Sequence, residues 1–529
     1  MAKLVLGPLL RHVNETSATV WVETDESCDV MIAGHTARTF QAGRQHFALV
    51  RLENLGPRTE YDVRLSSGGS WEPVWPEAGS KFPKPVIRTG EVRRIAFGSC
   101  RAAPHQPVGP DALDAFAQRL MSVPEAEWPQ AMILLGDQVY ADEPTEATKQ
   151  WLRDHRGDRR HDTEAPDGEV VDFSEYARLY HETWGDPEIR WLLSVVPTSM
   201  IFDDHDVRDD WNTSAVWRAE MAGKPWWRDR IRGGLASYWV YQHLGNLGPD
   251  ELARDPLYAK VKAQGTDVLP LLEEFAEEAD KELEGRKSTW WSFRRDFGRA
   301  RLLMVDTRCG RILADGKRQM ISDEEFEWIE RNSEGDFDHL LIGSSLPWLM
   351  PHALSHFQSL NEIGARKPGW QGKAAEKIRQ AVDLEHWPAF RESFDRLSRM
   401  IEKAANNGSA TVCVLSGDVH HSYVAEAEFP GPTKALVAQL VCSPVHNEAP
   451  RVFRPAFRLS WSRAASWVFR RLATLAGVPE DLMRWRKTSG PHFGNSVALL
   501  DFDGRRARYR LLSATGEETA SVLLGRESQ

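Results

Sequence analysis

Residues 411–423 read TVCVLSGDVHHSY, an apolar run followed by a glycine, a carboxylate and two imidazoles. The run TVCVL predicts a buried strand, because consecutive apolar and β-branched residues fit a strand that is covered on both faces. Asp418, His420 and His421 follow shortly after its end. A carboxylate and an imidazole at the carboxyl end of a buried strand can hold a metal ion. A polar loop without a metal explains this stretch equally well. The residues at other strand ends must therefore decide between a metal site and a polar loop.

Three other apolar runs also end in potential metal ligands. RRIAFGSC ends in Cys100, and AMILLGDQVYAD carries Asp137 and Tyr140 after its apolar part. Each of these residues alone fits a helix cap or an ordinary core position. The third run, VVPTSMIFDDHDVRDDWN, carries the largest group: Asp203, Asp204, His205, Asp206, Asp209 and Asp210. So many carboxylates at strand ends would repel one another unless cations neutralise them, and two cations fit better than one.

The ligand types indicate which ions the predicted site binds. Thiolate, phenolate and imidazole together suit a transition metal, and phenolate favours ferric iron. A group made mostly of carboxylates suits a hard cation such as calcium, magnesium or manganese. Two cations about 3.5–4 Å apart form a clamp for in-line displacement at phosphorus. These ligand types therefore favour a site that hydrolyses phosphoesters.

The order of the runs predicts an α/β fold for the larger part of the chain, residues 89–529. Apolar strands alternate there with helical patterns, and RLLMVDTR and HLLIGSSLPWLM add two further strands. Strands interleaved with helices indicate a layered α/β domain. In such sheets ligands collect beyond the carboxyl ends of the strands, which is where the polar clusters fall.

Residues 1–88 have a different pattern, which predicts a small all-β sandwich. Short alternating runs are separated by turn residues, and SATVWVET places Ala18, Val20 and Val22 on one side of a strand. The segment LENLGPRTEYDVRL resembles the tyrosine-corner region of fibronectin type III-like domains, with Tyr61 as the corner residue. We expect such a module to position or protect its neighbour, and we assign it no chemistry.

Composition limits the expected partners and compartment. With 529 residues, 41% hydrophobic and 27% charged, the chain fits a soluble protein of two or more packed units. A net charge of −11 argues against nucleic acid or an anionic membrane as the partner of the whole surface. The five scattered cysteines imply no disulfide framework. The stretch MAKLVLGPLLRHVNE lacks the apolar length of a signal peptide and has no twin-arginine pair, so a cytoplasmic location is expected.

Polar stretches near residues 143–190, 213–287 and 451–487 predict helical insertions between the strands. The third is rich in arginine and aromatic residues. It could form a lid that recruits anionic substrates, or an amphipathic helix that touches lipid headgroups. A helix simply packed on the domain is an equally good interpretation. One face of its helical pattern consists of Trp461, Ala464, Ala465, Val468, Leu472 and Leu475.

The motifs resemble those of known phosphoesterases. GDQVY resembles the GDxxY motif of purple acid phosphatases, DDHD stands where calcineurin-like phosphoesterases carry GNHE, and GDVHH is similar to their GHxH. The combination of FGSC, GDQVYAD, DDHDVRDDWN and SGDVHHSY is most similar to the PhoD-like phosphatase (alkaline phosphatase D) family. That resemblance implies a four-layer α/β/β/α sandwich, preceded by a fibronectin-like module, with bound ferric iron and calcium.

The resemblance also implies roles for particular residues. Asp137 would bridge the iron to calcium, or to manganese or magnesium in its place. His205 matches the motif histidine that contacts the phosphate or the leaving group. Arg101, next to Cys100, is a candidate phosphate contact, with an ordinary surface role as the alternative. The implied iron ligands are Cys100, Asp137, Tyr140 and His420, and the implied partners of Asp137 at the second ion are Asp204 and Asp418.

Two departures from the family pattern concern the second ion. Asp204 replaces the usual asparagine of GNHE, and DDW stands where several relatives have an asparagine pair. The resulting hypothesis is a phosphoesterase of monoesters, diesters or both, in which a metal-bound hydroxide attacks phosphorus at a binuclear or trinuclear site. A phospholipid-directed phosphodiesterase is one alternative, and a non-catalytic scaffold that keeps metals for structure is another. For the enzyme, the expected partner is a small phosphoester substrate and not nucleic acid, and residues 451–487 are a candidate for weak contact with a membrane surface.

Overall fold

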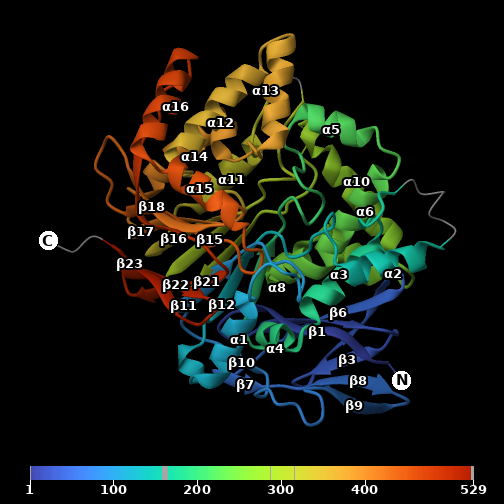
Figure 1. The fold of residues 1–529 in the computed structure, drawn as a ribbon. Helices are drawn as coiled ribbons and strands as arrows, with labels where there is room; N and C mark the ends of the chain where they lie inside the picture. Colours follow the sequence, from blue (N-terminus) through green and yellow to red (C-terminus); the bar gives the residue numbers. More distant parts are fainter. Residues whose placement is uncertain (1, 158–164, 286, 315, 526–529) are drawn as a thin grey trace.

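Two sheets form the centre of the computed structural model, which describes residues 2–157, 165–285, 287–314 and 316–525 (Figure 1). The six-stranded sheet has the order β13 (Thr198–Ile201), β12 (Ala131–Leu135), β11 (Arg94–Gly98), β21 (Ser496–Asp503), β22 (Arg506–Ser513), β23 (Glu518–Leu524). The seven-stranded sheet has the order β14 (Phe293–Phe297), β15 (Ala300–Val305), β16 (His339–Ser344), β17 (Thr411–Ser416), β19 (Leu436–Val441), β18 (Ser422–Glu428), β20 (Arg484–His492).

The alternation of side chains along β15 shows how the layers pack. Leu302 and Met304 belong to a core shared with β11, β12 and β21 of the other sheet. Leu303 and Val305 point the opposite way, into a core shared with the helices α11 (Asp323–Asn332) and α14 (Arg391–Ala404). Successive side chains of a strand face opposite sides, so one face of the sheet packs on a second sheet and the other on helices. The predicted α/β class is confirmed.

The strands that precede the predicted site residues run parallel within each sheet. β11, β12 and β13 are parallel neighbours, with Ile95 opposite Ala131 and Met132 opposite Thr198. In the other sheet β15, β16, β17 and β19 are parallel neighbours. Because parallel strands end at the same edge, the loops after β11, β12 and β13 lie together, as do those after β15 and β17.

The N-terminal region consists of small antiparallel sheets. Ala18, Val20 and Val22 share one core, as the alternation predicts. Trp21 faces the opposite side and packs on Tyr241 of the α/β part, with ring centroids 5.3 Å apart. The strands are β1 (Leu4–Val13), β2 (Ala18–Thr24), β6 (Gln45–Leu52) and β5 (Phe40–Ala42); β4 (His35–Arg38), β3 (Asp29–Ile32), β8 (Val63–Ser67) and β9 (Ser70–Trp75); and the pair β10 (Val86–Arg88) and β7 (Arg58–Glu60).

Tyr61 differs from the expected corner tyrosine. Its buried hydroxyl donates to the carbonyl of Ser194 at 2.6 Å, and Ser194 belongs to α4 (Pro187–Val195) of the α/β part. A corner tyrosine would bond to the backbone of its own module. Tyr61 therefore ties the N-terminal sheets to the rest of the molecule.

Helices lie in all three stretches that the sequence marks as insertions. Residues 143–190 contain α2 (Glu146–Arg156), α3 (Phe173–Trp184) and the start of α4, while 158–164 lie outside the described residues. Residues 213–287 contain α5 (Ala215–Ala222), α6 (Trp227–Tyr238), α7 (Leu244–Asn246), α8 (Pro249–Arg254), α9 (Pro256–Ala263) and α10 (Leu269–Asp280), with residue 286 outside the described residues. Residues 451–487 contain α15 (Arg454–Ser460), α16 (Arg463–Leu475) and the start of β20.

The sequence patterns did not indicate the helices between β16 and β17. These are α12 (His352–Ala365), α13 (Trp370–Ala381) and α14; a further helix, α1 (Ala112–Ser122), follows β11. Within the described part of the chain, the helices are all too short or too polar to span a lipid bilayer.

Arg11 of β1 joins the N-terminal sheets to the α/β part. Its fully buried guanidinium donates to the carbonyls of Thr198 at 3.1 Å, Tyr241 at 2.9 Å and Gln242 at 2.6 Å. Arg295 of β14 in turn donates to the Arg11 carbonyl at 3.1 Å. A buried carbonyl left without a donor costs about 1–3 kcal/mol. Arg11 avoids this cost at three carbonyls and thereby stabilises the junction.

Replacing Arg11 with leucine should therefore lower the free energy of unfolding by about 3 kcal/mol or more, because three buried carbonyls lose their donors. The measurement is urea denaturation followed by circular dichroism. Arg38→Leu is the matched control, since its side chain is 60% exposed and should change stability by less than about 0.5 kcal/mol. Equal effects of the two substitutions would contradict the role given to Arg11.

Candidate metal centre

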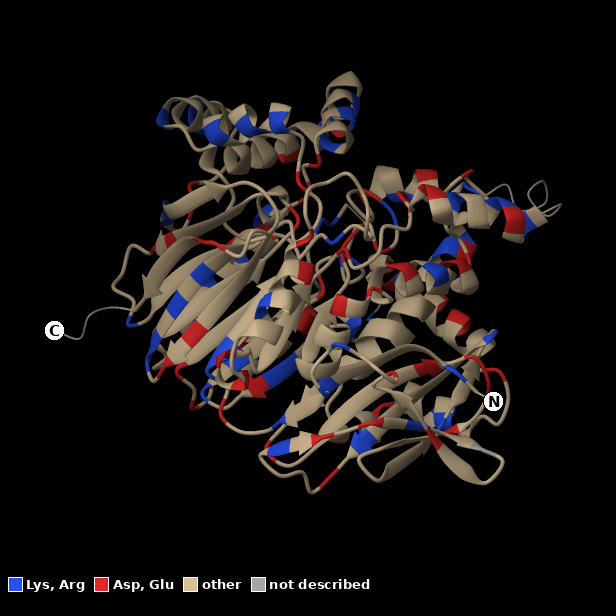
Figure 2. Cartoon of the chain, turned by 60° about the horizontal axis from the view of Figure 1, so that its bottom comes forward, with Lys and Arg blue, Asp and Glu red and all other residues tan. Residues whose placement is uncertain are grey.

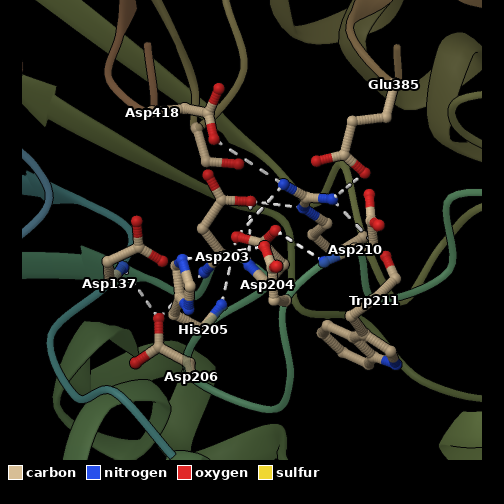
Figure 3. A network of polar contacts seen from close by, with 12 residues as sticks. Asp137, Asp203, Asp204, His205, Asp206, Asp210, Trp211, Glu385 and Asp418 are labelled. Atoms are coloured by element: carbon tan, nitrogen blue, oxygen red, sulfur yellow. Dashed lines mark hydrogen bonds and ion pairs between the residues drawn. The ribbon is translucent and has the colours of Figure 1, made fainter. Parts of the chain in front are cut away.

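Residues that follow separate strands meet at one buried place. The Cys100 thiol, after β11, lies 3.2 Å from a carboxylate oxygen of Asp137, after β12. Asp137, Asp203 and Asp204 each offer one oxygen within 4.8 Å of the others. Cys100 also lies 3.8 Å from the backbone carbonyl of Asp418, after β17. Figure 3 shows these carboxylates converging from both sheets.

Two glycines allow the strand ends to come so close. A Cβ on Gly136, whose φ is +100°, would lie 2.5 Å from the Cβ of Asp203. A Cβ on Gly417 would lie 2.0 Å from the hydroxyl of Ser99. Gly136 thus permits the contact between the ends of β12 and β13, and Gly417 permits the contact between the two sheets.

The predicted ligands themselves adopt an unusual backbone conformation. Cys100, Asp137, Asp418 and His420 have φ values of +56°, +52°, +65° and +48°. The left-handed region costs a non-glycine residue about 1–3 kcal/mol when it is held in strain, and such residues concentrate at functional sites. Four of the predicted ligands share this feature, which turns their side chains toward one another at the strand ends.

The carboxylates of the centre are deeply buried and incompletely satisfied. One oxygen of Asp137 and one of Asp203 have no hydrogen-bond partner. Burial raises the pKa of both groups well above the usual range, and neighbouring carboxylates raise it further. The pKa of the Cys100 thiol is also raised, first by burial and then by Asp137. A bound cation would reverse these effects, so the centre has the electrostatics of a metal site.

Arg308, which the sequence analysis did not single out, lies among these carboxylates. Its fully buried guanidinium pairs with Asp203 and Glu385, and lies 3.3 Å from Asp204 and 3.8 Å from Asp418. It supplies one fixed positive charge to several negative ones, and therefore cannot neutralise the cluster by itself. The signal that could have found it is the strand RLLMVDTR, which ends in an arginine at the same edge of the sheet.

Asp206, the last residue of DDHD, holds the loops in place. One of its oxygens accepts hydrogen bonds from the backbone amides of Asp137 and Asp203, both at 2.9 Å. The other accepts from Gln242 at 3.2 Å. Because both of its oxygens accept hydrogen bonds, Asp206 positions the two loops and is not counted among the metal ligands.

Asp418 lies at the edge of the centre and is held by a histidine that the sequence analysis also missed. The ring of His386 lies 2.7 Å from one Asp418 oxygen and contacts Gln358 through its other nitrogen at 2.9 Å. Burial alone would raise the pKa of Asp418, but the hydrogen bond from His386 lowers it to about 2. Asp418 is therefore a carboxylate with its negative charge retained.

His205 is held by Asp142, two residues beyond Tyr140 in the GDQVYAD run. The Nδ1 atom of His205 lies 3.0 and 3.2 Å from the two oxygens of Asp142. Burial lowers the pKa of His205, but Asp142 more than offsets this, and the pKa is raised well above its usual value. The other ring nitrogen, Nε2, lies 3.8 Å from a carboxylate oxygen of Asp209, whose side chain is 62% exposed. His205 is thus held by Asp142 through one nitrogen and lies next to an exposed carboxylate with the other.

Tyr140 and His420 are the two remaining residues of the predicted set of metal ligands. The Tyr140 ring packs on His205 with centroids 4.6 Å apart, and its hydroxyl accepts a hydrogen bond from Asn447 at 3.0 Å. The backbone amide of His420 donates to Ser443 at 3.2 Å. Burial lowers the pKa of His420 to about 4, so its ring is neutral, as a metal ligand requires.

Arg101 is a correction to the sequence analysis. It is neither a phosphate contact nor a surface residue, because its guanidinium is buried and committed elsewhere. Two of its nitrogens donate to Asp111 at 2.9 and 2.7 Å, and the third donates to the carbonyl of Thr183 at 2.7 Å. Asp111 caps the N-terminus of α1, so Arg101 fixes that helix, and all three of its nitrogens are engaged inside the protein.

A two-sheet α/β fold that gathers buried carboxylates and a thiol at its strand ends is a hydrolase-type scaffold with an acidic site suited to hold cations. The profile of the PhoD-like phosphatase family matches residues 115–466, and the chain belongs to this family. It is therefore a phosphatase, and the resemblance drawn from the motifs is confirmed. Residues 1–87 match a domain of unknown function, DUF7800.

Solved structures support the fold. One described as "Structure of PhoD" superposes with a TM-score of 0.56 at 13% identity, over 99% of this chain and 89% of that chain. A cyclomaltodextrinase aligned over 96% of this chain and 89% of its own, at 9% identity, has a TM-score of only 0.14, which is too low to indicate a shared fold. Among curated proteins, none matches the chain.

Replacing Arg308 with methionine should destabilise the metal-free protein by about 3–5 kcal/mol, because Asp203 would lose its buried ion-pair partner and Glu385 would keep only Arg311. The measurement is thermal denaturation in the presence of a chelator. Arg331→Met is the matched control, since that side chain is 67% exposed and pairs with Glu327, which is 62% exposed. A midpoint unchanged from the natural protein would show that Arg308 does not stabilise the acidic centre.

Proposed function

We propose that this phosphatase hydrolyses phosphomonoesters, phosphodiesters or both at a binuclear centre of ferric iron and calcium, with manganese or magnesium as alternatives for calcium. One observation carries the proposal: Cys100, Asp137 and Asp203 come from three separate strands and meet in a buried cluster with two unpartnered carboxylate oxygens. Such a cluster is costly to bury unless cations complete it.

The donor set supports two different ions. Thiolate, phenolate and neutral imidazole suit iron, whereas oxygens alone suit a hard cation. Asp203 belongs to the second group by position, although the motif comparison did not include it. We assign Cys100, Asp137, Tyr140 and His420 to iron, and Asp137, Asp203, Asp204 and Asp418 to the second ion.

The cations, when bound, activate water and offset the negative charge of the phosphoryl group. The residues of the chain hold this arrangement in place. Arg308 and Asp206 fix the aspartates after β12 and β13, and His386 fixes Asp418. Because these partners are buried and already hydrogen-bonded, the ligands need little rearrangement during the reaction.

His205 is assigned to the leaving group. Asp142 holds its Nδ1, and its Nε2, next to the exposed Asp209, is the nitrogen left to donate to a departing ester oxygen. A polar cavity of about 330 Å³ lies beside Tyr140 and Asp142 and is bordered by Asn447 and Lys149. That cavity gives room for the alcohol part of an ester.

The metal assignment predicts that Asp137→Asn and His420→Ala each lower hydrolysis of an aryl phosphate by at least about 10²–10³-fold. Both variants should stay folded, because each loses a buried group whose burial is unfavourable without metal. The measurements are turnover, circular dichroism and elemental analysis of iron. Asp114→Asn is the matched control: Asp114 lies in another acidic cluster, with Asp186 and Glu188, and its loss should leave turnover unchanged. Turnover equal to that of the wild-type protein in either test variant would refute the assignment of that residue as a metal ligand.

The leaving-group role predicts a dependence on the ester. His205→Ala should slow hydrolysis of an alkyl phosphate by about 10²–10⁴-fold, because the departing alkoxide needs a donor. Hydrolysis of 4-nitrophenyl phosphate, whose leaving group is stable as an anion, should fall much less. Asp142→Asn should show the same pattern in weaker form. A uniform loss on both esters would mean that His205 binds the phosphoryl group and does not assist departure.

A further inference from the structure

The apolar face of α16 is exposed to solvent. Trp467 is 65% exposed and Leu475 is 79% exposed, and Val468 and Leu472 between them are also exposed. The helix packs on α12 through its opposite face, where Phe469 contacts Phe357 with ring centroids 5.4 Å apart. The helix is therefore packed on the domain, as one of the interpretations of the sequence had it, while Val468, Leu472 and Leu475 of its predicted apolar face remain exposed.

The exposed apolar residues continue into the segment before α16. Val452, Phe453 and Leu459 are all more than half exposed. Of the fourteen large hydrophobic side chains that are exposed in the described part of the chain, seven lie between residues 452 and 475. A concentration of this kind marks an interaction site, because single exposed apolar residues are normally scattered.

The same segment is strongly basic. Residues 451–479 contain six arginines and no acidic residue, in a chain whose net charge is −11. Lys and Arg are prominent on the helices at the top of Figure 2, with few Asp or Glu beside them. Arginines beside exposed tryptophan and leucine are the composition of a helix that lies in a lipid interface. The six arginines are Arg451, Arg454, Arg458, Arg463, Arg470 and Arg471.

A second helix at the same end of the molecule repeats this character. α13 and α16 both pack on α12, and all three helices project from the top of the α/β part in Figure 1. At the start of α13, Trp370 is 77% exposed, and Ile378 further along is exposed as well. Lys367, Lys373 and Lys377 are exposed around them. We call the exposed residues 366–382 and 451–475 the α13–α16 surface.

The α13–α16 surface is connected to the metal centre. Phe457 of α15 packs on His421, the neighbour of the predicted ligand His420, with ring centroids 4.7 Å apart. Trp461, just after α15, packs on Tyr423 at 5.1 Å. The loop after β17 is therefore in direct contact with the segment that carries the exposed arginines.

We propose that the α13–α16 surface docks on an anionic phospholipid surface. The arginines and lysines match lipid phosphates, and the tryptophans and leucines match the boundary between headgroups and acyl chains. A second copy of this chain fits less well, because a two-fold interface would place the arginines against themselves. Nucleic acid would satisfy the arginines but offers no apolar phase for Leu475 and Trp467. The docking is independent of which ester the centre hydrolyses.

The first test is sedimentation of the full-length chain with vesicles of phosphatidylglycerol and phosphatidylcholine, and with phosphatidylcholine alone. We expect binding only to the anionic vesicles, weakened at about 1 M salt. Trp467→Ser combined with Leu475→Ser should lower the partition coefficient by about tenfold or more, and Arg470→Glu with Arg471→Glu by about tenfold. Hydrolysis of a soluble aryl phosphate should be unchanged in both pairs.

Matched controls exist elsewhere on the molecule. Val216→Ser with Leu523→Ser removes two exposed apolar residues outside the α13–α16 surface, and Arg506→Glu with Arg508→Glu reverses two exposed charges on β22. These pairs should bind vesicles like the natural chain. Equal losses in control and test variants would overturn the proposal, as would failure of the natural chain to bind anionic vesicles.

A second readout locates the contact. All five natural cysteines are buried, so a polarity-sensitive dye can be attached selectively to Leu475→Cys. Its emission should shift to shorter wavelength with anionic vesicles, whereas a dye on Leu523→Cys should not respond. A shift only at the control position would overturn the proposal. So would a dimer in sedimentation velocity that the Trp467→Ser, Leu475→Ser pair dissolves, or equally tight binding to duplex DNA.

Discussion

Mutual repulsion among buried carboxylates is the constraint on which the rest of this structure depends. Asp137, Asp203 and Asp204 lie within one ligand shell of each other and are almost completely removed from water. In such surroundings like charges raise one another's pKa, and the ionised forms need positive charge close by. Arg308 supplies part of it from a distant part of the chain, and the ring of His386 forms a hydrogen bond with Asp418. The remaining deficit, with two unpartnered oxygens, is what a pair of cations would meet.

The backbone around the centre follows from the same constraint. To gather ligands from two sheets, the chain must turn sharply as each strand ends, which is why Cys100, Asp137 and Asp418 have positive φ. Gly136 and Gly417 then remove the Cβ atoms that would keep the loops apart. Strain at these positions persists only where surrounding contacts determine the conformation, and the hydrogen bonds of Asp206 to two loop amides are such contacts. The fold stabilises an arrangement that isolated loops would not adopt.

The sequence predicted the ends of the strands better than the partners of the ligands. The residues after β11, β12, β13 and β17 were found because an apolar run that stops at a ligand is a local pattern. Arg308 and His386 were missed because what makes them important is a contact with residues more than thirty positions away. The prediction that Arg101 contacts the phosphate failed for the opposite reason. Arg101 is adjacent to Cys100 in sequence, but its side chain turns to Asp111. Which way a side chain points beyond a strand end is decided by packing.

The same limit explains α16. Periodicity placed Val468, Leu472 and Leu475 on one face of the helix but could not say whether that face lies against the core or the solvent, because both orientations give the same spacing. In the structure the small and aromatic residues Ala473 and Phe469 fill the contact with α12, and the larger apolar residues remain outside. The segment before it rests on His421, beside the metal centre. A lipid surface that displaced this segment would therefore also change the contacts of the loop after β17.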